Sequence, residues 1–310
     1  MKNRDLVKRF LEVSKLEKNL SWRTLKAYNC DLGDFLKFFK SKKINLLSIE
    51  DLREYLAYLE GKKLADSTTK RKLATIKVLY SFLEDEGFID ISPTKKLKKK
   101  YRISRRIPRV MSLDEIGRLL KAAYMMSAGK SHESIFHRFK RLRDRVILEI
   151  LFATGIRIDE LVRLNVDDLD VIARTLIIFG KGRKERLIYI SSDEVVNLIN
   201  DYLKIRSEYD HSSSAFLLNK FGNRLSVHSI GNIFKEYCKI AGVIRKFTPH
   251  CLRHTMATML VENGADVRSV QEILGHSRIS TTEIYLTVSK RRKEIVLSQF
   301  NQRNSLHIAL

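Results

Sequence analysis

The segment 248–285 gathers residue types that suit phosphoryl transfer. A guanidinium is permanently charged and forks onto phosphate oxygens, whereas an imidazole moves protons near neutral pH. A phenol oxygen can form a covalent phospho-enzyme. His250, Arg253 and Tyr285 supply these three groups within one short stretch. The segment therefore predicts a site that acts on phosphate esters.

Helix signals indicate how this segment presents its polar residues. Thr248 can N-cap a helix with Pro249 at its first position, and Gly275 stands where a later helix ends. His250 and Arg253 are three residues apart, so they share one helical face. We expect both side chains to point away from the core, because the opposite face carries an apolar stripe. That stripe is Leu252, Met256 and Leu260.

Two further basic residues are weaker candidates when taken alone. Arg157 follows a turn signal at Gly155, and by itself it would be interpreted as the partner of a nearby carboxylate in a surface ion pair. Lys181 lies in a Gly-containing hairpin between the β-rich runs 175–179 and 185–190. There, an exposed turn lysine is the ordinary interpretation.

The charge balance points to a polyanionic partner. The chain has 310 residues, with 59 Lys and Arg against 36 Asp and Glu, which gives a formal net charge of +23. Such an excess favours nucleic acid. An anionic membrane surface is the competing interpretation, but no apolar run approaches the roughly 18 residues of a spanning helix. The N-terminus lacks the apolar core of a signal peptide, so we expect a cytoplasmic protein. Three scattered cysteines predict unpaired, reduced thiols.

Apolar periodicity predicts a mainly α-helical protein with two domains. Residues 1–94 read as a four-helix bundle, with helices over 4–18, from 21, over 48–61 and over 67–86. Residues 95–107 form a basic linker. The second domain, 108–310, reads as mostly helical with a small antiparallel sheet and a further short strand at 215–218. Its apolar tail, 305–310, either completes its own core or docks on a neighbouring protomer.

Two basic stretches outside this segment are candidate DNA contacts. Along a phosphate backbone, a dense run of positive charge releases counterions and gains affinity. For the first stretch a solvated basic face is the alternative, and for the linker a nuclear-localisation signal. The residues predicted to contact DNA are Lys70, Arg71, Lys72, Lys77, Lys98, Lys99 and Lys100.

Residue types, order and spacing together resemble the signature of the tyrosine recombinases, the integrase and Xer group. The match rests on His250-x-x-Arg253-His254, Leu274-Gly275-His276 and Tyr285. The N-terminal part resembles the SAM-like core-binding bundle of this family through Ser21-x-x-Thr24-x-x-x-Tyr28-x-x-Asp31-Leu32. The resemblance covers nearly the whole chain, and it implies that the second domain is catalytic.

The resemblance also implies a set of site residues and a reaction. Six residues fall on the active-site positions of the family, and Glu160 falls on its supporting acidic position. The six are Arg157, Lys181, His250, Arg253, His276 and Tyr285. Such enzymes transfer a DNA phosphodiester to tyrosine, giving a 3′-phosphotyrosyl bond and a free 5′-hydroxyl, and then reverse the transfer onto another strand. The resemblance implies no cofactor and no metal ion.

The implied partners are double-stranded DNA with inverted-repeat half-sites and further recombinase subunits. These subunits form a homotetramer on two sites or include a paralogous recombinase. Chromosome or plasmid multimer resolution and mobile-element integration or excision both fit. The alternatives are a non-catalytic sequence-specific DNA-binding protein and an enzyme resembling a type IB topoisomerase. A metallohydrolase ranks lower, because Cys251 stands where the metalloprotease motif requires Glu.

Overall fold

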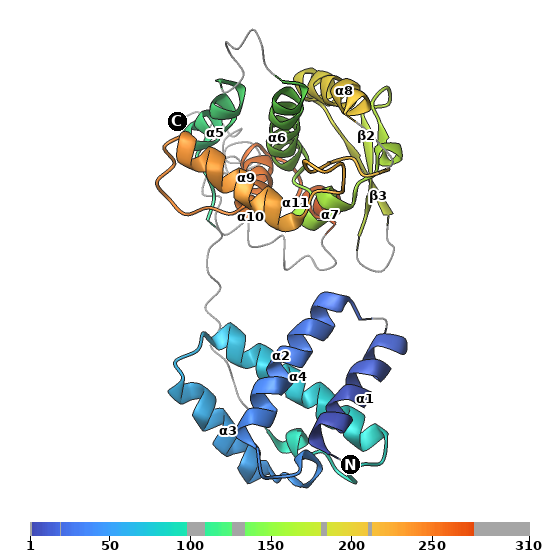
Figure 1. The fold of residues 1–310 in the computed structure, drawn as a ribbon. Helices are drawn as coiled ribbons and strands as arrows, with labels where there is room; N and C mark the ends of the chain where they lie inside the picture. The colour runs from blue at the N-terminus through green and yellow to red at the C-terminus, as the bar shows by residue number, and fades with distance from the viewer. Residues whose placement is uncertain are drawn as a thin grey trace, which may run out of the picture. The chain divides into compact units, whose positions relative to one another are not determined.

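A computed structural model of the chain describes residues 2–18, 20–97, 109–125, 134–180, 185–209 and 213–275. The chain divides into two compact units, Met1–Arg105 and Arg106–Leu310 (Figure 1). This division falls inside the stretch predicted as a linker, of which residues 98–107 lie outside the described part. The domain limits predicted at 94 and 107 therefore remain predictions.

The described part of the first unit is helical, with local capping signals at two helix starts. The Ser21 hydroxyl accepts a hydrogen bond from the Thr24 backbone, and Ser48 and Asp51 form a capping box. The elements are α1 (Asn3–Leu16), α2 (Trp22–Phe38), α3 (Ile49–Gly61), α4 (Asp66–Asp85) and the 3-10 turns Ile44–Leu46 and Pro93–Lys96.

Aromatic side chains from three helices fill the core of this unit. Phe35, Tyr55 and Tyr80 are essentially inaccessible to solvent, and Phe35 meets both tyrosines edge to face. Leu97, the third residue of the predicted linker, is also buried in this core. The four helices therefore enclose one apolar core, as the periodicity predicts.

The second unit combines helices with a small sheet. In the described residues these are α5 (Leu113–Met125), α6 (Ile135–Thr154), α7 (Ile158–Arg163), the 3-10 turn Val166–Asp168, β1 (Leu169–Asp170), β2 (Thr175–Phe179), β3 (Glu185–Tyr189), α8 (Asp193–Glu208), α9 (Val227–Ile240), α10 (Pro249–Glu262) and α11 (Val267–Leu274). Helix α6 packs against α5, α8, α9 and α10. The predicted fold class, mainly helical with a small antiparallel sheet, is confirmed.

The sheet has the order β1-β2-β3, and both strand pairs are antiparallel. Side chains alternate across it, so that Leu176, Ile178 and Ile188 are buried while Leu187 is largely exposed. Arg186 pairs with Ile178 in this register. It therefore lies on the inward side of β3, among apolar neighbours.

The strand expected at 215–218 is wrong, because this buried segment forms only isolated bridges to Asn165 and Arg224. Its backbone finds other partners. The guanidinium of Arg206 donates to the carbonyl oxygens of Ala215 and Phe216, and the Phe216 amide donates to the Leu164 carbonyl. A side chain and a neighbouring loop thus satisfy groups that a strand partner would otherwise satisfy.

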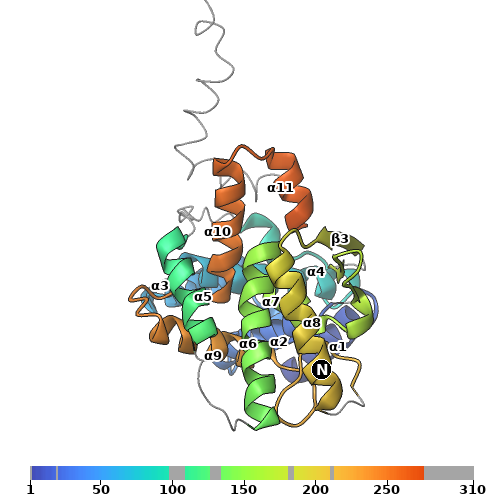
Figure 2. The same cartoon turned by 90° about the horizontal axis from the view of Figure 1, so that it is seen from above.

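Helices α10 and α11 pack on each other next to the end of α6 (Figure 2). Ala257 and Val261 of α10 and Val270 and Leu274 of α11 form a small cluster of fully buried side chains. Gly275 ends α11 in a left-handed conformation with φ +63°. This packing fixes the C-terminal end of α11 against the body of the second unit.

Candidate active site

Arg253 on α10 is buried, with 3% of the residue exposed. Its guanidinium donates to the carbonyl oxygen of Gly155 at 2.6 Å and to that of Leu274 at 2.7 Å. The expectation that Arg253 points away from the core is therefore wrong. The ends of α6 and α11 cover this side of α10. Because these elements are distant in the sequence, the apolar periodicity of α10 alone does not predict that they bury Arg253.

Arg157 precedes α7 and is held by the buried carboxylate of Glu160. The Arg157 backbone amide and side chain each donate to Glu160 at 2.8 Å. Another N–H of the guanidinium donates to the Gly275 carbonyl at 3.2 Å. The ion-pair interpretation of Arg157 is thus confirmed, but Glu160 is only 4% exposed and the pair is not an ordinary surface contact.

Arg186 on β3 is a third arginine of this cluster, and the sequence reasoning did not select it. Its guanidinium donates to both carboxylate oxygens of Glu160, at 3.1 and 2.7 Å, and to the Ile273 carbonyl at 3.1 Å. A sequence signal existed, because the alternation in β3 places Arg186 on the same side as buried Ile188. An arginine on the inward side of a strand needs a buried partner.

Burial alone would raise the pKa of the Glu160 carboxyl group. Hydrogen bonds from Arg186 and from Arg157 instead lower this pKa to about 2. Glu160 is therefore an anion at neutral pH. One carboxylate faces two guanidinium groups, with Arg253 beside them, so these four side chains carry a net positive charge.

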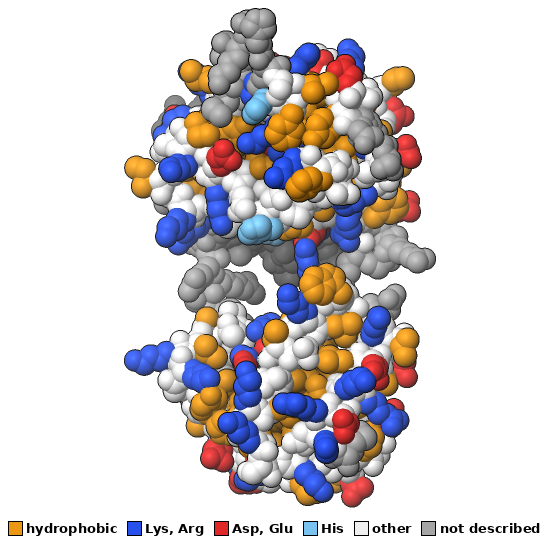
Figure 3. Space-filling view, in the orientation of Figure 1, with side chains coloured by type: hydrophobic (Ala, Val, Ile, Leu, Met, Phe, Trp, Pro, Cys, Tyr) orange, Lys and Arg blue, Asp and Glu red, His pale blue; other side chains and the backbone are white. Residues whose placement is uncertain are grey.

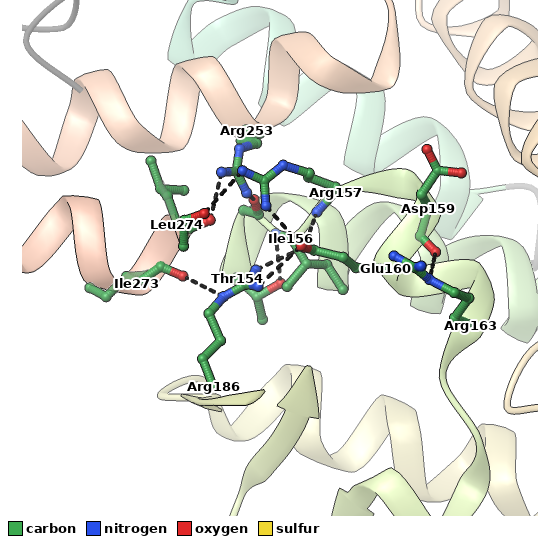
Figure 4. A network of polar contacts seen from close by, with 12 residues as sticks. Thr154, Ile156, Arg157, Asp159, Glu160, Arg163, Arg186, Arg253, Ile273 and Leu274 are labelled. Carbon is green, nitrogen blue, oxygen red and sulfur yellow. Dashed lines mark hydrogen bonds and ion pairs between the residues drawn. The ribbon is translucent and has the colours of Figure 1, made fainter. Parts of the chain in front are cut away.

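The three arginines converge on the end of α11 (Figure 4). The consecutive carbonyl oxygens of Ile273, Leu274 and Gly275 accept hydrogen bonds from Arg186, Arg253 and Arg157, respectively. The partial negative charge at a helix C-terminus favours this arrangement. In the sequence, Gly275 is followed by His276, which is one of the predicted active-site residues. The carbonyl groups that bind the three arginines therefore belong to the three residues just before a predicted site residue.

His250, the second residue of α10, lies beside this cluster and is exposed. Partial desolvation and the charges of Arg253 and Arg157 lower the pKa of His250 below its ordinary value. Burial and the charges of His250 and Arg253 lower the pKa of His254 to about 4. Both imidazoles are therefore neutral at pH 7, and a neutral imidazole can accept a proton.

Three of the six predicted active-site residues, Lys181, His276 and Tyr285, lie outside the described residues. The structure brings Arg157, Glu160 and Arg253 together, with His250 close enough to be influenced by their charges. The described part of the site therefore holds the residues expected to neutralise a phosphate and one expected to move a proton.

The predicted DNA contacts on α4 separate into exposed and buried residues. Lys70, Arg71 and Lys77 are exposed. The Lys72 side chain is buried, and its ammonium donates to Asp31 at 3.2 Å and to Asp34 at 2.8 Å. We therefore do not propose Lys72 as a DNA contact, because its ammonium group is buried and paired with two carboxylates of its own unit.

Arg71 also donates to Asp31, although its side chain is half exposed. Lys98, Lys99 and Lys100 lie outside the described residues. Figure 3 shows Lys and Arg side chains spread over the visible face of each unit. Among the described residues, no group of three or more His, Cys, Asp or Glu side chains gathers as metal ligands, and no helix is long and apolar enough to cross a bilayer.

Family models match two parts of the chain. The phage integrase family matches residues 109–292, and the phage integrase N-terminal SAM-like domain matches residues 7–87. The first match covers more than half of the chain and contains the arginine cluster, Glu160, His250 and His254.

Individual relatives extend over nearly the full length. Tyrosine recombinase XerC of Leptospira interrogans is 34% identical over 295 residues, which cover 94% of this chain and 91% of that protein. Tyrosine recombinase XerD of Staphylococcus epidermidis is 33% identical over 304 residues, covering 96% and 99%. A crystal structure of XerH site-specific recombinase bound to palindromic difH substrate, in a post-cleavage complex, superimposes with a TM-score of 0.75 at 23% identity, covering 95% and 84%.

Proposed function

The chain belongs to the phage integrase family, and from this premise we propose how its residues carry out the reaction. It is a site-specific tyrosine recombinase, an enzyme that breaks and rejoins DNA strands. In this family the broken strand is held as a phosphotyrosyl intermediate. Each step of that chemistry can be assigned to residues of this chain.

We assign the nucleophile to Tyr285. Its phenol oxygen attacks the phosphorus of a DNA phosphodiester, a 3′-phosphotyrosyl bond forms, and the bond to the 5′-oxygen of the next nucleotide breaks. Neutral His250 takes the phenol proton, and Lys181 gives a proton to the departing 5′-oxygen. Attack by the 5′-hydroxyl of another strand reverses these steps and releases the tyrosine.

Arg157 and Arg253 stabilise the negative charge that the phosphate carries in the transition state, and His276 adds a hydrogen bond to it. The observation that supports this role is the cluster itself. Arg157, Arg186 and Arg253 gather around Glu160 and the end of α11, which leaves an excess of positive charge beside His250. A phosphodiester is the anion that balances such an excess.

The proposed substrate is double-stranded DNA whose site contains two inverted-repeat half-sites, one for each of two subunits. Two such sites are brought together by four subunits, either identical or including a paralogous recombinase. Exposed Lys70, Arg71 and Lys77 are proposed to contact the DNA backbone, together with Lys98, Lys99 and Lys100. Multimer resolution and mobile-element integration or excision remain the two proposed settings, and a cytoplasmic location remains a prediction.

The test begins by selecting genomic fragments of the native host with the purified full-length protein and sequencing them for an inverted repeat. A duplex carrying that repeat, with a nick beside the scissile phosphate, lets a short 5′-hydroxyl fragment diffuse away and traps the cleaved state. We expect a covalent protein–DNA complex that survives denaturation. Binding without any covalent complex would instead indicate a sequence-specific DNA-binding protein.

The same assay separates the recombinase from an enzyme that resembles a type IB topoisomerase. A recombinase joins the cleaved strand to a strand of a second duplex, so we expect exchanged products when two differently labelled copies of the site are present. Cleavage and resealing confined to the original duplex, on any sequence, would support the topoisomerase alternative.

A further inference from the structure

Arg186 connects three elements of the second unit. It belongs to β3, its guanidinium grips Glu160 of α7, and it donates to the carbonyl of Ile273 in α11. The side chain is 14% exposed, against 2% for the carboxylate of Glu160. A charged group so nearly enclosed is held in one orientation by its partners.

Glu160 is shared between Arg186 and Arg157. Its Oε1 accepts from both guanidinium groups, at 3.1 Å from Arg186 and 2.8 Å from Arg157. The Glu160 carboxylate therefore links the two guanidinium groups, so that a shift of this carboxylate would reach Arg157 as well. Without Arg186, Glu160 would neutralise Arg157 alone, and the positive charge offered to a phosphate would fall.

Arg186 also lies tightly against the end of α11. A Cβ atom added to Gly275 would stand 3.0 Å from Nη1 of Arg186 and 3.1 Å from its Cζ. The guanidinium therefore packs on the glycine that directly precedes His276. The Arg186 side chain thus contacts both Glu160, which binds Arg157, and Gly275, which precedes His276 in the sequence.

We propose that Arg186 is a positioning residue for strand cleavage, one that sets Arg157 through Glu160 and holds the end of α11 in place. This inference rests on the proposed function. Lysine cannot replace Arg186, because a single ammonium cannot reproduce the planar fork on Glu160 together with the bond to Ile273. Loss of the fork misplaces Arg157, and a misplacement of about 1 Å can slow a reaction by about 100-fold.

The experiment measures single-turnover cleavage of the nicked substrate at saturating protein by the wild type, Arg186→Lys and Arg186→Met. We expect cleavage about 10- to 100-fold slower for both variants, with DNA affinity within about threefold of the wild type. Arg224→Lys is the matched control. Arg224 is a partly buried arginine that donates to the carbonyls of Val162 and Leu164 and to the side-chain oxygen of Asn165, and none of its hydrogen bonds given by the structure goes to Glu160. Its variant should cleave at the wild-type rate.

A second substrate separates positioning from a general loss of structure. A methylphosphonate at the scissile position lacks one anionic oxygen, so it needs less charge stabilisation from Arg157. If Arg186 acts through Arg157, the deficits of Arg186→Met and Arg157→Ala both shrink on this substrate. A variant that is only partly folded is equally impaired on both substrates, and thermal unfolding identifies it.

Equal deficits on the two substrates, or cleavage by both Arg186 variants within about threefold of the wild type, would overturn the proposal. If Arg186→Met does not fold, Arg186→Lys carries the comparison, because it keeps the charge and most of the buried stem. Failure of the proposed function is a different result, in which the wild type itself forms no covalent complex.

Discussion

Arg253 and Arg157 bind their surroundings in different ways. Arg253 is buried and donates to the carbonyls of Gly155 and Leu274, whereas Arg157 is about one-third exposed and is paired with Glu160. Carbonyl partners orient a guanidinium without cancelling its charge. The two carbonyls therefore hold the Arg253 guanidinium in a fixed orientation, whereas the charge that Arg157 offers is proposed to be set by Glu160 and Arg186.

Lys181 is the residue whose proposed role can be isolated most sharply by chemistry. Expulsion of a 5′-alkoxide is slow unless a proton arrives, and arginine is a poor donor because its pKa is too high. We expect Lys181→Ala to cleave ordinary DNA about 10² to 10⁴-fold more slowly. A substrate with sulfur at the bridging 5′-position should restore the rate, because a thiolate leaves without protonation.

Arg157→Ala and Lys184→Ala are the controls for this rescue. The sulfur substrate should not rescue Arg157→Ala, since the charge that Arg157 stabilises lies on the non-bridging oxygens. Lys184→Ala should be close to the wild type on both substrates. Rescue of Lys184→Ala, or none for Lys181→Ala, would assign the general acid elsewhere.

Single residues show where sequence reasoning succeeds and where it stops. The types and spacing around His250 and Arg253 predicted a phosphate-handling cluster, and the structure brings Arg157, Glu160 and Arg253 together. The burial of Arg253 and of Lys72 was not predictable from helical periodicity, because α6 and α11 cover the first and α2 covers the second. Such burial arises from tertiary packing and leaves no local pattern.

At the level of elements, local signals were the most reliable. Ser48 and Asp51 cap α3, and Ser112 and Glu115 exchange hydrogen bonds at the start of α5, a spacing of three residues that is typical of a capping box. Gly155 takes the left-handed conformation that ends α6. These features depend on neighbours a few residues apart. The expected strand at 215–218 failed because the partners of its backbone come from α8 and from the loop after α7.

Gly275 ends α11 with a positive φ, and it also leaves room for the Arg186 side chain. A matched pair of alanine variants can separate these two roles. Gly275 and Gly222 both have positive φ, at 63° and 75°, but an added Cβ meets Arg186 only at Gly275 and nothing at Gly222. Alanine at either position costs about 1–2 kcal/mol of backbone strain. We expect Gly275→Ala alone to slow cleavage as well, by about 10-fold, because it also displaces Arg186.

Single-turnover cleavage and thermal unfolding of Gly275→Ala and Gly222→Ala check this expectation. Gly275→Ala should lose at least as much stability as Gly222→Ala, while only Gly275→Ala should lose rate. Equal cleavage rates in the two variants would mean that the packing of Arg186 on Gly275 has no effect on the site.

For the whole molecule, the net charge of +23 predicts salt-dependent DNA binding, with a contribution from the basic linker. Replacing Lys98, Lys99 and Lys100 with alanine should weaken binding to specific and nonspecific DNA alike. The slope of log affinity against log salt should fall by up to about 0.9 for each phosphate that is no longer neutralised. Titrations over a range of salt concentrations measure that slope.

A charge-matched control distinguishes direct binding from net charge. Lys204, Lys220 and Lys239 are exposed on the second unit, and their triple replacement removes the same charge. The linker variant should change the slope more than this control. Equal changes would show that the linker lysines act only through the total charge of the protein.

The apolar tail, 305–310, lies outside the described residues, and its docking on a neighbouring protomer remains a prediction. The roles proposed for the exposed lysines and arginine of α4, for the linker and for the tail are in DNA binding and subunit assembly. The arginine cluster of the second unit concerns the chemistry. The assembly and the chemistry can therefore be tested separately.

The most direct test of the proposed mechanism is the identity of the residue that carries the DNA in the trapped complex. After digestion of DNA and protein, mass spectrometry should find the nucleotide on the tryptic peptide 279–290, in which Tyr285 is the only tyrosine. The link should be to the 3′ end of the broken strand, and Tyr285→Phe should bind DNA but form no adduct. A nucleotide on any other peptide, or an adduct formed by Tyr285→Phe, would contradict the proposed mechanism.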